Sequence, residues 1–147
     1  MEFNLDHTVN HRIATVAILL KRQVYRIIAE NKLEITPEQW VVMYYLWKEN
    51  GLSVKEIASR SRKDMGNVTR IVDKLSKLGY VSRRKGEKDS RVSNIYILPK
   101  AEEIKEQIQN CWRESTEIAI NGISDAEQQL LLGILDKVEK NILENLD

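Results

Sequence analysis

The sequence predicts a mainly α-helical protein that carries one small β-hairpin. Apolar residues recur at spacings of three and four over most of the chain, which is the period of an amphipathic helix. Three Ser/Thr-x-x-Glu/Gln patterns match the capping boxes at which helices begin. Two short runs rich in β-forming residues flank Gly86, an arrangement typical of a hairpin. With 147 residues, of which 42% are hydrophobic, the chain can bury a core as one domain or as two closely joined halves.

The first two predicted helices occupy the N-terminal third of the chain. Residues 9–30 contain no Gly or Pro and place apolar side chains three and four apart, so we expect one long amphipathic helix that packs against another element. The second helix begins at Thr36, which can cap it, while Pro37 suits the first turn and Gln39 completes a capping box. Gly51 ends this second helix.

Two further helices precede the hairpin. The capping box of Ser53 and Glu56 begins a short helix that ends near Ser61. In the next helix, residues 64–78, apolar side chains lie on one side. The opposite side carries a polar stripe, which consists of Asn67, Arg70, Lys74 and Lys77. The stripe is expected to face solvent or a ligand, and Gly79 suits the position just after the helix.

The hairpin carries a cluster of cations at its tip, and helices follow it. After Pro99 the helical period resumes as far as Ala119, and a capping box that starts at Ser124 begins the last helix. In this last helix the apolar residues lie four, three, four and four apart: Leu131, Leu135, Val138, Ile142 and Leu146. The first and the last two helices carry more apolar residues than the middle of the chain can cover. Such seams suit association with a second copy of the chain.

The net charge of +1 hides a separation of charge along the chain. Residues 1–52 are neutral overall. Residues 53–100 contain 13 Lys and Arg against 5 Asp and Glu, a net charge of +8, whereas residues 101–147 contain 4 against 11, a net charge of −7. A basic segment of this density is typical of a surface that binds phosphates, and the acidic segment must serve another purpose.

Several functional classes are disfavoured by the composition. The chain has no run of roughly 18 apolar residues and no basic-then-apolar signal pattern in residues 1–10, so we expect a cytoplasmic protein without membrane contact. The single cysteine, Cys111, allows no internal disulfide or thiolate zinc site, and its apolar helix face predicts a packed, inert thiol. No catalytic nucleophile with its base and acid, phosphate loop or metal-ligand cluster stands out, so we expect no enzyme and no cofactor.

Several stretches of the chain match a known pattern in both order and spacing. They are Ile35-Thr36-Pro37-Glu38-Gln39-Trp40, Ser53-Val54-Lys55-Glu56-Ile57-Ala58, Asn67-Val68-Thr69-Arg70-Ile71-Val72-Asp73-Lys74-Leu75, Leu78-Gly79-Tyr80-Val81-Ser82-Arg83 and Asp89-Ser90-Arg91. On these stretches the chain resembles the MarR family of transcriptional regulators over nearly its whole length. The resemblance implies a homodimeric winged helix-turn-helix whose dimer interface is built by both termini. It also implies that the Asp-x-Arg of the hairpin, which is the wing, places an arginine at the minor groove of DNA.

The predicted organisation has two parts. Residues 35–99 form a winged helix-turn-helix DNA-binding domain, and residues 1–34 and 100–147 form a helical dimerisation region. The expected function is a dimeric, sequence-specific transcriptional regulator of double-stranded DNA, with repression favoured and release by a small molecule as a further hypothesis. Twofold symmetry requires a pseudo-palindromic operator with half-sites about 10 bp apart. The alternative is a winged-helix protein-interaction module without DNA binding, which does not need the +8 segment.

The helical part of the expected DNA-binding set lies on and beside the polar stripe. Asn67 and Arg70 can bond bidentately to adenine and guanine from the first turns of the helix, and Gly66 allows a close approach of the backbone. Thr69 and Ser53 are expected to bind phosphate, the latter because it stands at a helix N-terminus. The alternative for all of them is an ordinary solvated surface. The full helical set is Ser53, Lys63, Gly66, Asn67, Thr69, Arg70 and Lys74.

In the wing, Arg91 is the strongest candidate for DNA contact. Asp89 is an acid within a basic loop, which disfavours phosphate binding unless the acid is paired, so we infer that Asp89 orients Arg91. Arg84, Lys85 and Lys88 are expected to add affinity and salt dependence without sequence preference. The alternative is that the loop is simply a soluble basic turn.

Two other groups of residues have alternative interpretations. An aromatic set could line an effector cleft between the two parts of the protein, or could simply pack in the core: Tyr25, Trp40, Tyr44, Tyr45 and Trp47. His7 and His11 are four apart and could begin a metal site, but few carboxylates lie near them in sequence. A solvated or dimer-interface role is therefore favoured for both histidines, and no metal is expected.

Overall fold

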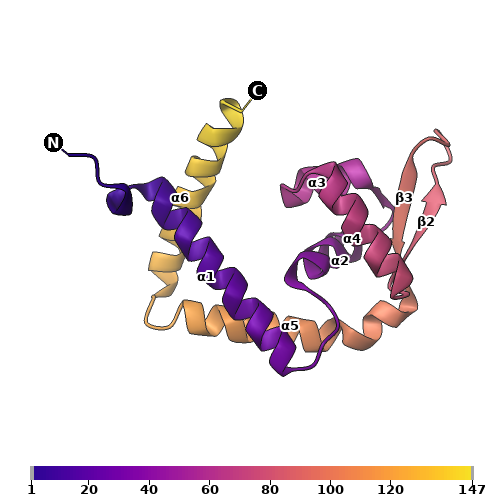
Figure 1. Cartoon of the computed structure of the whole chain (residues 1–147), viewed down its shortest axis with the longest axis horizontal. Coiled ribbons are helices and arrows are strands. Elements are labelled where there is room, and N and C mark those ends of the chain that lie inside the picture. The colour runs from indigo at the N-terminus through magenta and orange to yellow at the C-terminus, as the bar shows by residue number, and fades with distance from the viewer. Residues whose placement is uncertain (1, 147) are drawn as a thin grey trace.

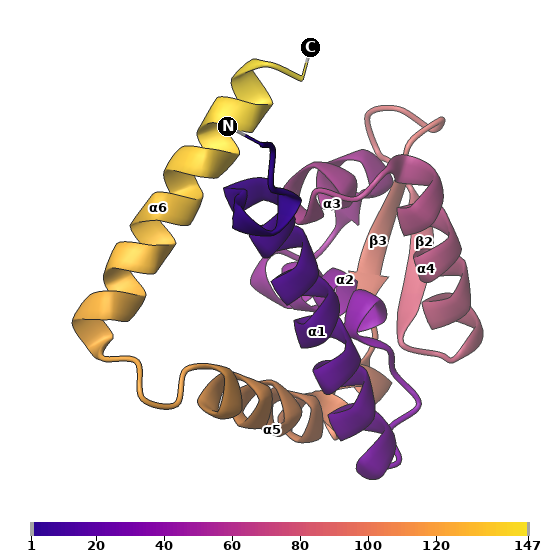
Figure 2. The same ribbon diagram turned by 60° about the vertical axis from the view of Figure 1, so that its left-hand side comes forward.

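The computed structural model describes residues 2–146 and shows a helical molecule with a small sheet at one end (Figure 1). The elements, in chain order, are η1 (Leu5–His7), α1 (Val9–Glu30), α2 (Pro37–Lys48), β1 (Leu52–Ser53), α3 (Val54–Ser61), α4 (Met65–Lys77), β2 (Val81–Lys85), β3 (Ser93–Ile97), η2 (Pro99–Ala101), α5 (Glu102–Ala119) and α6 (Asp125–Glu144). In Figure 1, α2, α3, α4 and the strands form one group, while α1 crosses α5 and α6 stands beyond α1. Turning the molecule separates α6 from the rest of the chain (Figure 2).

The helix starts predicted from capping boxes are confirmed. The hydroxyl of Thr36 accepts a hydrogen bond from the backbone N–H of Gln39 at 3.2 Å, and the Gln39 side chain accepts from the Thr36 N–H at 3.0 Å. The pairs Ser53 with Glu56 and Ser124 with Glu127 repeat this arrangement at α3 and α6. Each box satisfies backbone donors that a helix N-terminus otherwise leaves free, which fixes where the helix begins.

The described strands form one antiparallel sheet in the order β1–β3–β2. Strands β2 and β3 are the predicted hairpin, with Val81 opposite Ile97 and Lys85 opposite Ser93. Strand β1 was not predicted from the sequence, because it has only two residues and resembles the start of the following helix. Its pairing of Leu52 with Ile95 ties the base of the wing to the helices.

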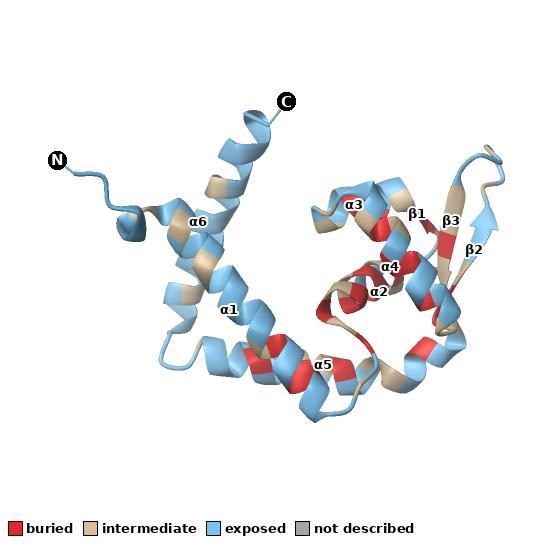
Figure 3. Ribbon diagram, in the orientation of Figure 1, coloured by how far each residue is buried: buried red, intermediate tan, exposed pale blue. Residues whose placement is uncertain are grey.

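The main core lies among α2, α3, α4, the sheet and the start of α5 (Figure 3). As the periodicity predicted, the inner face of α4 is buried through Val68, Ile71, Val72 and Leu75. Gly79 ends this helix with φ +86°, a conformation that glycine adopts without strain. Burial of the inner face leaves the polar stripe of α4 on the outside.

A second, smaller core joins α1 to α5. It consists of Val24, Ile27 and Ile28 of α1 with Cys111 of α5. Burial, the larger cause, and the charge of Glu114 raise the pKa of the Cys111 thiol, which agrees with the packed, inert thiol that was predicted. Helix α6 contributes to neither core, since all of its residues are exposed or half-buried. Figure 3 shows this helix almost wholly in the colour of exposed residues.

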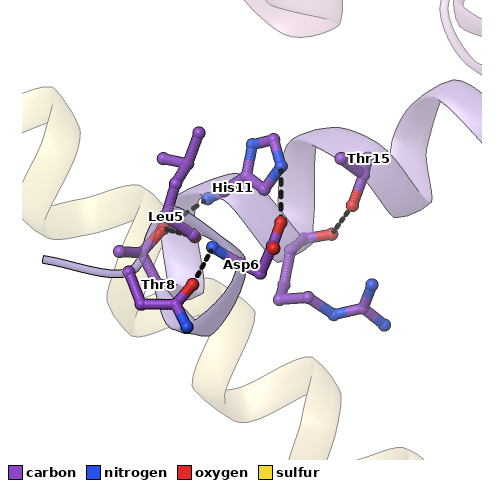
Figure 4. Close-up of polar contacts among 7 residues, drawn as sticks. Leu5, Asp6, Thr8, His11 and Thr15 are labelled. Atoms are coloured by element: carbon purple, nitrogen blue, oxygen red, sulfur yellow. Dashed lines mark hydrogen bonds and ion pairs between the residues drawn. The ribbon is translucent and has the colours of Figure 1, made fainter.

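The N-terminal turn caps α1 (Figure 4). The Thr8 hydroxyl accepts from the His11 N–H at 3.3 Å and donates to the Leu5 carbonyl at 2.9 Å, while the His11 ring lies 3.8 Å from Asp6. His7 belongs to η1 and not to α1, so the two histidines do not share one helix face. Within residues 2–146 no group of three or more His, Cys, Asp or Glu could hold a metal ion.

None of the helices within residues 2–146 combines the length and the apolar sequence that a membrane span requires.

Candidate nucleic-acid interface

Helix α4 presents its polar stripe on the outer surface of the main core. Asp64 caps the helix by accepting a hydrogen bond from the Asn67 N–H at 2.7 Å. Gly66, Arg70 and Lys74 are exposed, and Asn67 and Thr69 are half-buried. A Cβ on Gly66 would lie 3.3 Å from Asp64 Oδ1 and 3.7 Å from Arg70 Nη1, and only the first of these distances is tight. Arg70 Nη1 therefore lies close to the start of α4.

Two members of the expected DNA-binding set lie elsewhere. Ser53 is only 7% exposed, and its hydroxyl already accepts a hydrogen bond from the Glu56 N–H at 3.1 Å. The same hydroxyl still has its own proton to donate to a phosphate oxygen, so phosphate binding by Ser53 stays a prediction. Lys63 is half-buried in the loop between α3 and α4 and lines a cavity that faces α1 and α5. It thus lies at the inner side of the helix-turn-helix.

At the tip of the wing, Asp89 and Arg91 form the pair inferred from the sequence. Asp89 Oδ1 accepts from the Arg91 backbone N–H at 3.0 Å and from Nε at 3.1 Å, and Oδ2 accepts from Nη2 at 3.1 Å. These hydrogen bonds hold the pKa of Asp89 below its ordinary value. The Arg91 side chain is 90% exposed despite this pairing, so the planar guanidinium is fixed at the surface.

Another arginine joins the wing to α4. Arg83 of β2 makes an ion pair with Asp73 of α4, and its Nη2 also donates to the Thr69 carbonyl at 3.4 Å. Arg83 was not among the residues predicted from the sequence to bind DNA. The available signal was Asp73, an acid within the basic segment, but no local spacing connects it to the wing. This pair makes the wing and α4 one continuous surface.

The remaining cations of the wing differ in their surroundings. Arg84 of β2 lies over the ring of Tyr96 of β3, with 4.3 Å between the guanidinium carbon and the ring centroid. Lys85 and Lys88 are exposed. Lys74 extends the same basic character along the outer side of α4. The same role was predicted for Arg84, Lys85 and Lys88, but in the structure only Arg84 lies over an aromatic ring.

The aromatic residues predicted as an effector cleft are divided between different environments. Trp40, Tyr44 and Tyr45 line a cavity of about 480 Å³ together with Val41, Gln109, Trp112 and Arg113. Tyr25 and Trp47 are not part of this lining. The Tyr25 hydroxyl donates to Glu38, and the Trp47 indole N–H donates to Glu102 at 2.9 Å. The structure therefore brings three of the five aromatic residues together at this cavity.

A second cavity, of about 470 Å³, was not anticipated from the sequence. Its walls come from α1, α2, α5 and the loop before α4, and they are mainly apolar: Ala17, Leu20, Lys21, Val24, Pro37, Glu38, Val41, Lys63, Trp112, Ser115, Thr116, Ala119 and Ile120. Trp112 lines both cavities, and its buried indole N–H has no acceptor within residues 2–146. These residues are far apart in the sequence, so no local motif could reveal the cavity.

A polar network borders this second cavity. Lys21 of α1 pairs with Glu38 of α2 at 2.9 Å, and Tyr25 donates to the same carboxylate. Burial acts to raise the pKa of Glu38, but hydrogen bonds from Lys21 and Tyr25 outweigh it, and the net change is downward. Burial, together with the Glu38 carboxylate, raises the pKa of Tyr25 to about 12. The network fixes α1 against the start of α2.

The helices, the three-stranded sheet within residues 2–146 and the outward stripe of α4 define a winged helix-turn-helix protein. The MarR family profile matches residues 35–93. The transcriptional regulator BilQ of Clostridium symbiosum is 30% identical over 96 residues, which cover 65% of this chain and 67% of BilQ. The chain therefore belongs to the MarR family of transcriptional regulators. This is a non-enzymatic family, as the sequence analysis expected.

Two further comparisons describe the extent of the likeness. The regulator TtmR of Methylorubrum extorquens is 39% identical over 72 residues, or 49% of this chain, and the match spans only 37% of TtmR. A solved structure of Bordetella bronchiseptica BpsR has a TM-score of 0.87 at 16% identity and covers 95% of this chain and 98% of its own. DNA binding by BpsR is regulated by 6-hydroxynicotinic acid. At this identity the likeness shows the fold.

Proposed function

We propose that the protein is a dimeric, sequence-specific transcriptional regulator that binds double-stranded DNA. The observation that carries the proposal is the surface formed by α4 and the wing, where Arg83 ties the wing to Asp73. In helix-turn-helix docking the corresponding helix enters the major groove, so Asn67 and Arg70 are assigned to base edges. Arg91, fixed by Asp89, is assigned to the minor groove beside it.

The rest of the surface supplies contacts with the DNA backbone. Lys74 on α4 and Arg84, Lys85 and Lys88 on the wing are exposed cations that suit phosphate oxygens. They give affinity that weakens as the salt concentration rises. Ser53 is assigned to a phosphate as well, since its hydroxyl accepts from the Glu56 N–H at the N-terminus of α3 and keeps its own proton to donate.

Residues 1–34 and 100–147 are proposed to form the dimerisation region, and residues 35–99 the DNA-binding domain. The apolar side chains of α6 and the first half of α1 are exposed in the single chain, including Leu131 at 50% and Leu19 at 57%. A second copy would cover them, since helical seams of this kind associate in symmetric dimers. The resulting twofold axis matches a pseudo-palindromic operator with half-sites about 10 bp apart. The acidic C-terminal region then belongs to the dimer interface and lies away from DNA.

A small apolar molecule is proposed to control release from DNA, which makes the protein a ligand-responsive repressor. The cavity between α1, α2 and α5 is mainly apolar and includes Lys21 and Lys63 at its edge. The free indole N–H of Trp112 could donate to an acceptor on such a ligand. Because Lys63 belongs to the loop before α4, a ligand here would act on the element that sets the position of α4. The regulation of BpsR by 6-hydroxynicotinic acid supports control of this chain by a small molecule.

The DNA-binding proposal is tested by selection from genomic fragments. Sheared DNA of the source organism is incubated with the purified protein at low salt, bound fragments are recovered and sequenced, and a duplex with the shared sequence is used in a gel shift. We expect the recovered fragments to share a pseudo-palindromic sequence. In the gel shift, the retarded band should contain two copies of the chain for each duplex. Absence of retardation at low salt would favour the protein-interaction alternative.

A further inference from the structure

Tyr96 occupies a distinctive position at the base of the wing. Tyr96 lies on β3, and the Arg84 guanidinium of β2 lies over its ring, 4.3 Å from the ring centroid. The ring also lies against the turn before β1, where a Cβ on Gly51 would approach Tyr96 Cε1 to 3.0 Å. Gly51 has φ +82° and donates its N–H to the Ile95 carbonyl at 2.9 Å. The ring is thus held by backbone and can in turn hold Arg84.

The arginines of the wing are restrained in two different ways. Arg83 and Arg91 are paired with the carboxylates of Asp73 and Asp89, which partly neutralise their charge. An aromatic face attracts a guanidinium through its quadrupole and leaves the full positive charge in place. Arg84 is therefore oriented without loss of its net charge.

We propose that Tyr96 is a positioning residue for DNA binding, and that it orders Arg84 for contact with a backbone phosphate. This inference rests on the proposed DNA-binding function. A free arginine side chain loses rotamer freedom when it binds, and a side chain that is already ordered loses less. The contact of Tyr96 with Gly51 extends this order from the wing to the turn after α2.

The experiment is a double-mutant cycle on affinity for the selected duplex. Tyr96→Leu is expected to weaken binding about 2- to 10-fold, the range for ordering one long side chain, whereas Tyr96→Phe keeps the ring and should bind like the wild type. In the Arg84→Ala background, Tyr96→Leu should have no further effect. Lys85→Ala provides the matched control, because Lys85 is a neighbouring exposed cation on the other side of β2. Tyr96→Leu and Lys85→Ala should act independently.

A measurement on the free protein separates positioning from folding. The side-chain protons of Arg84 should show an upfield ring-current shift by NMR in the wild type and in Tyr96→Phe, and should lose it in Tyr96→Leu. Thermal unfolding identifies any variant that does not fold, and Tyr96→Thr, a β-forming substitution, then replaces Tyr96→Leu.

The possible outcomes are distinct. If the wild type retards no DNA, the proposed function fails and this inference fails with it. If the wild type binds but Tyr96→Leu binds equally well, or weakens binding equally with and without Arg84, the positioning role is overturned while DNA binding stands. Weakening by Tyr96→Phe would assign the effect to the hydroxyl and would also overturn it.

Discussion

Arg83 of β2 and Asp73 of α4 form an ion pair that connects the wing to the helix that we assign to the major groove. Arg83 also donates to the Thr69 carbonyl on the same helix. The two basic elements therefore hold one relative orientation before any DNA is bound. Such preorganisation reduces the ordering that binding would otherwise require.

Loss of this pair should affect DNA binding more than folding. Because both side chains are partly exposed, the coupling between Asp73→Ala and Arg83→Ala in the free energy of unfolding should be about 0.2–1 kcal/mol. Asp73→Ala also removes a negative charge from a DNA-facing surface, yet we expect weaker binding because the wing is released. Urea unfolding and fluorescence anisotropy on the selected duplex measure the two effects. Tighter binding of Asp73→Ala would show that charge, and not the position of the wing, is decisive.

Asp89→Asn should weaken DNA binding although it makes the wing more basic. The substitution removes the carboxylate that accepts hydrogen bonds from Nε and Nη2 of Arg91, so the arginine loses its fixed orientation. Glu87→Gln is the matched control, since it removes the same charge from the same exposed loop. Binding titrations should give a lower affinity for Asp89→Asn and an unchanged or higher affinity for Glu87→Gln. Equal effects of the two variants would contradict an orienting role for Asp89.

Glu38→Gln should destabilise the protein at neutral pH but not in acid. The unfolded side chain titrates near 4.5, and the folded pKa lies lower, so the contribution of Glu38 is complete above about pH 4.5 and is lost as the pH falls through the folded pKa. We expect a loss on the order of 1 kcal/mol at pH 7, measured by urea unfolding, and a smaller difference at pH 3. Glu30→Gln, at the exposed pair with Arg26, should have little effect at pH 7. A Glu38→Gln difference that does not shrink in acid would contradict the network.

Leu131→Glu should convert the protein from dimer to monomer without unfolding the chain. Leu131 is 50% exposed on α6, so a charge there is tolerated in a single chain but is buried without a partner in the proposed dimer. Analytical ultracentrifugation gives the mass, and circular dichroism gives the helix content. Gln129→Glu introduces the same charge at another exposed position of the same helix, and Gln129 lies outside the apolar seam. A dimer that persists in Leu131→Glu would exclude this seam from the interface.

Asn67→Ala or Arg70→Ala should relax the choice of base at one operator position. A bidentate contact with a base edge contributes about 1–3 kcal/mol of discrimination between bases. The alanine substitution should therefore cause no further loss of affinity on a duplex in which that base pair is already changed. Titrations over a set of singly substituted duplexes locate the position. An equal loss on every duplex would assign the residue to a phosphate contact.

The parts of the structure that the sequence predicted depend on residues close together in the chain. Capping boxes and the period of α4 involve spacings of three and four, and the Asp89–Arg91 pair a spacing of two. The contacts that were missed join distant segments: Arg83 with Asp73, β1 with β3, and Trp112 with the walls of both cavities. The capping role of Ser53 follows from its spacing to Glu56, whereas its low exposure comes from the pairing of β1 with β3, which no local spacing indicates.

The most direct test of the account is the salt dependence of binding to a selected operator duplex. A dimer that applies α4 and a wing to each half-site should displace many counterions, so affinity should fall by about 10³- to 10⁵-fold between 50 and 200 mM salt, as for proteins with 6–10 phosphate contacts. Arg91→Ala should reduce the slope of log affinity against log salt concentration. An affinity that does not change with salt, or a slope that Arg91→Ala leaves unchanged, would contradict the assignment of the wing to DNA.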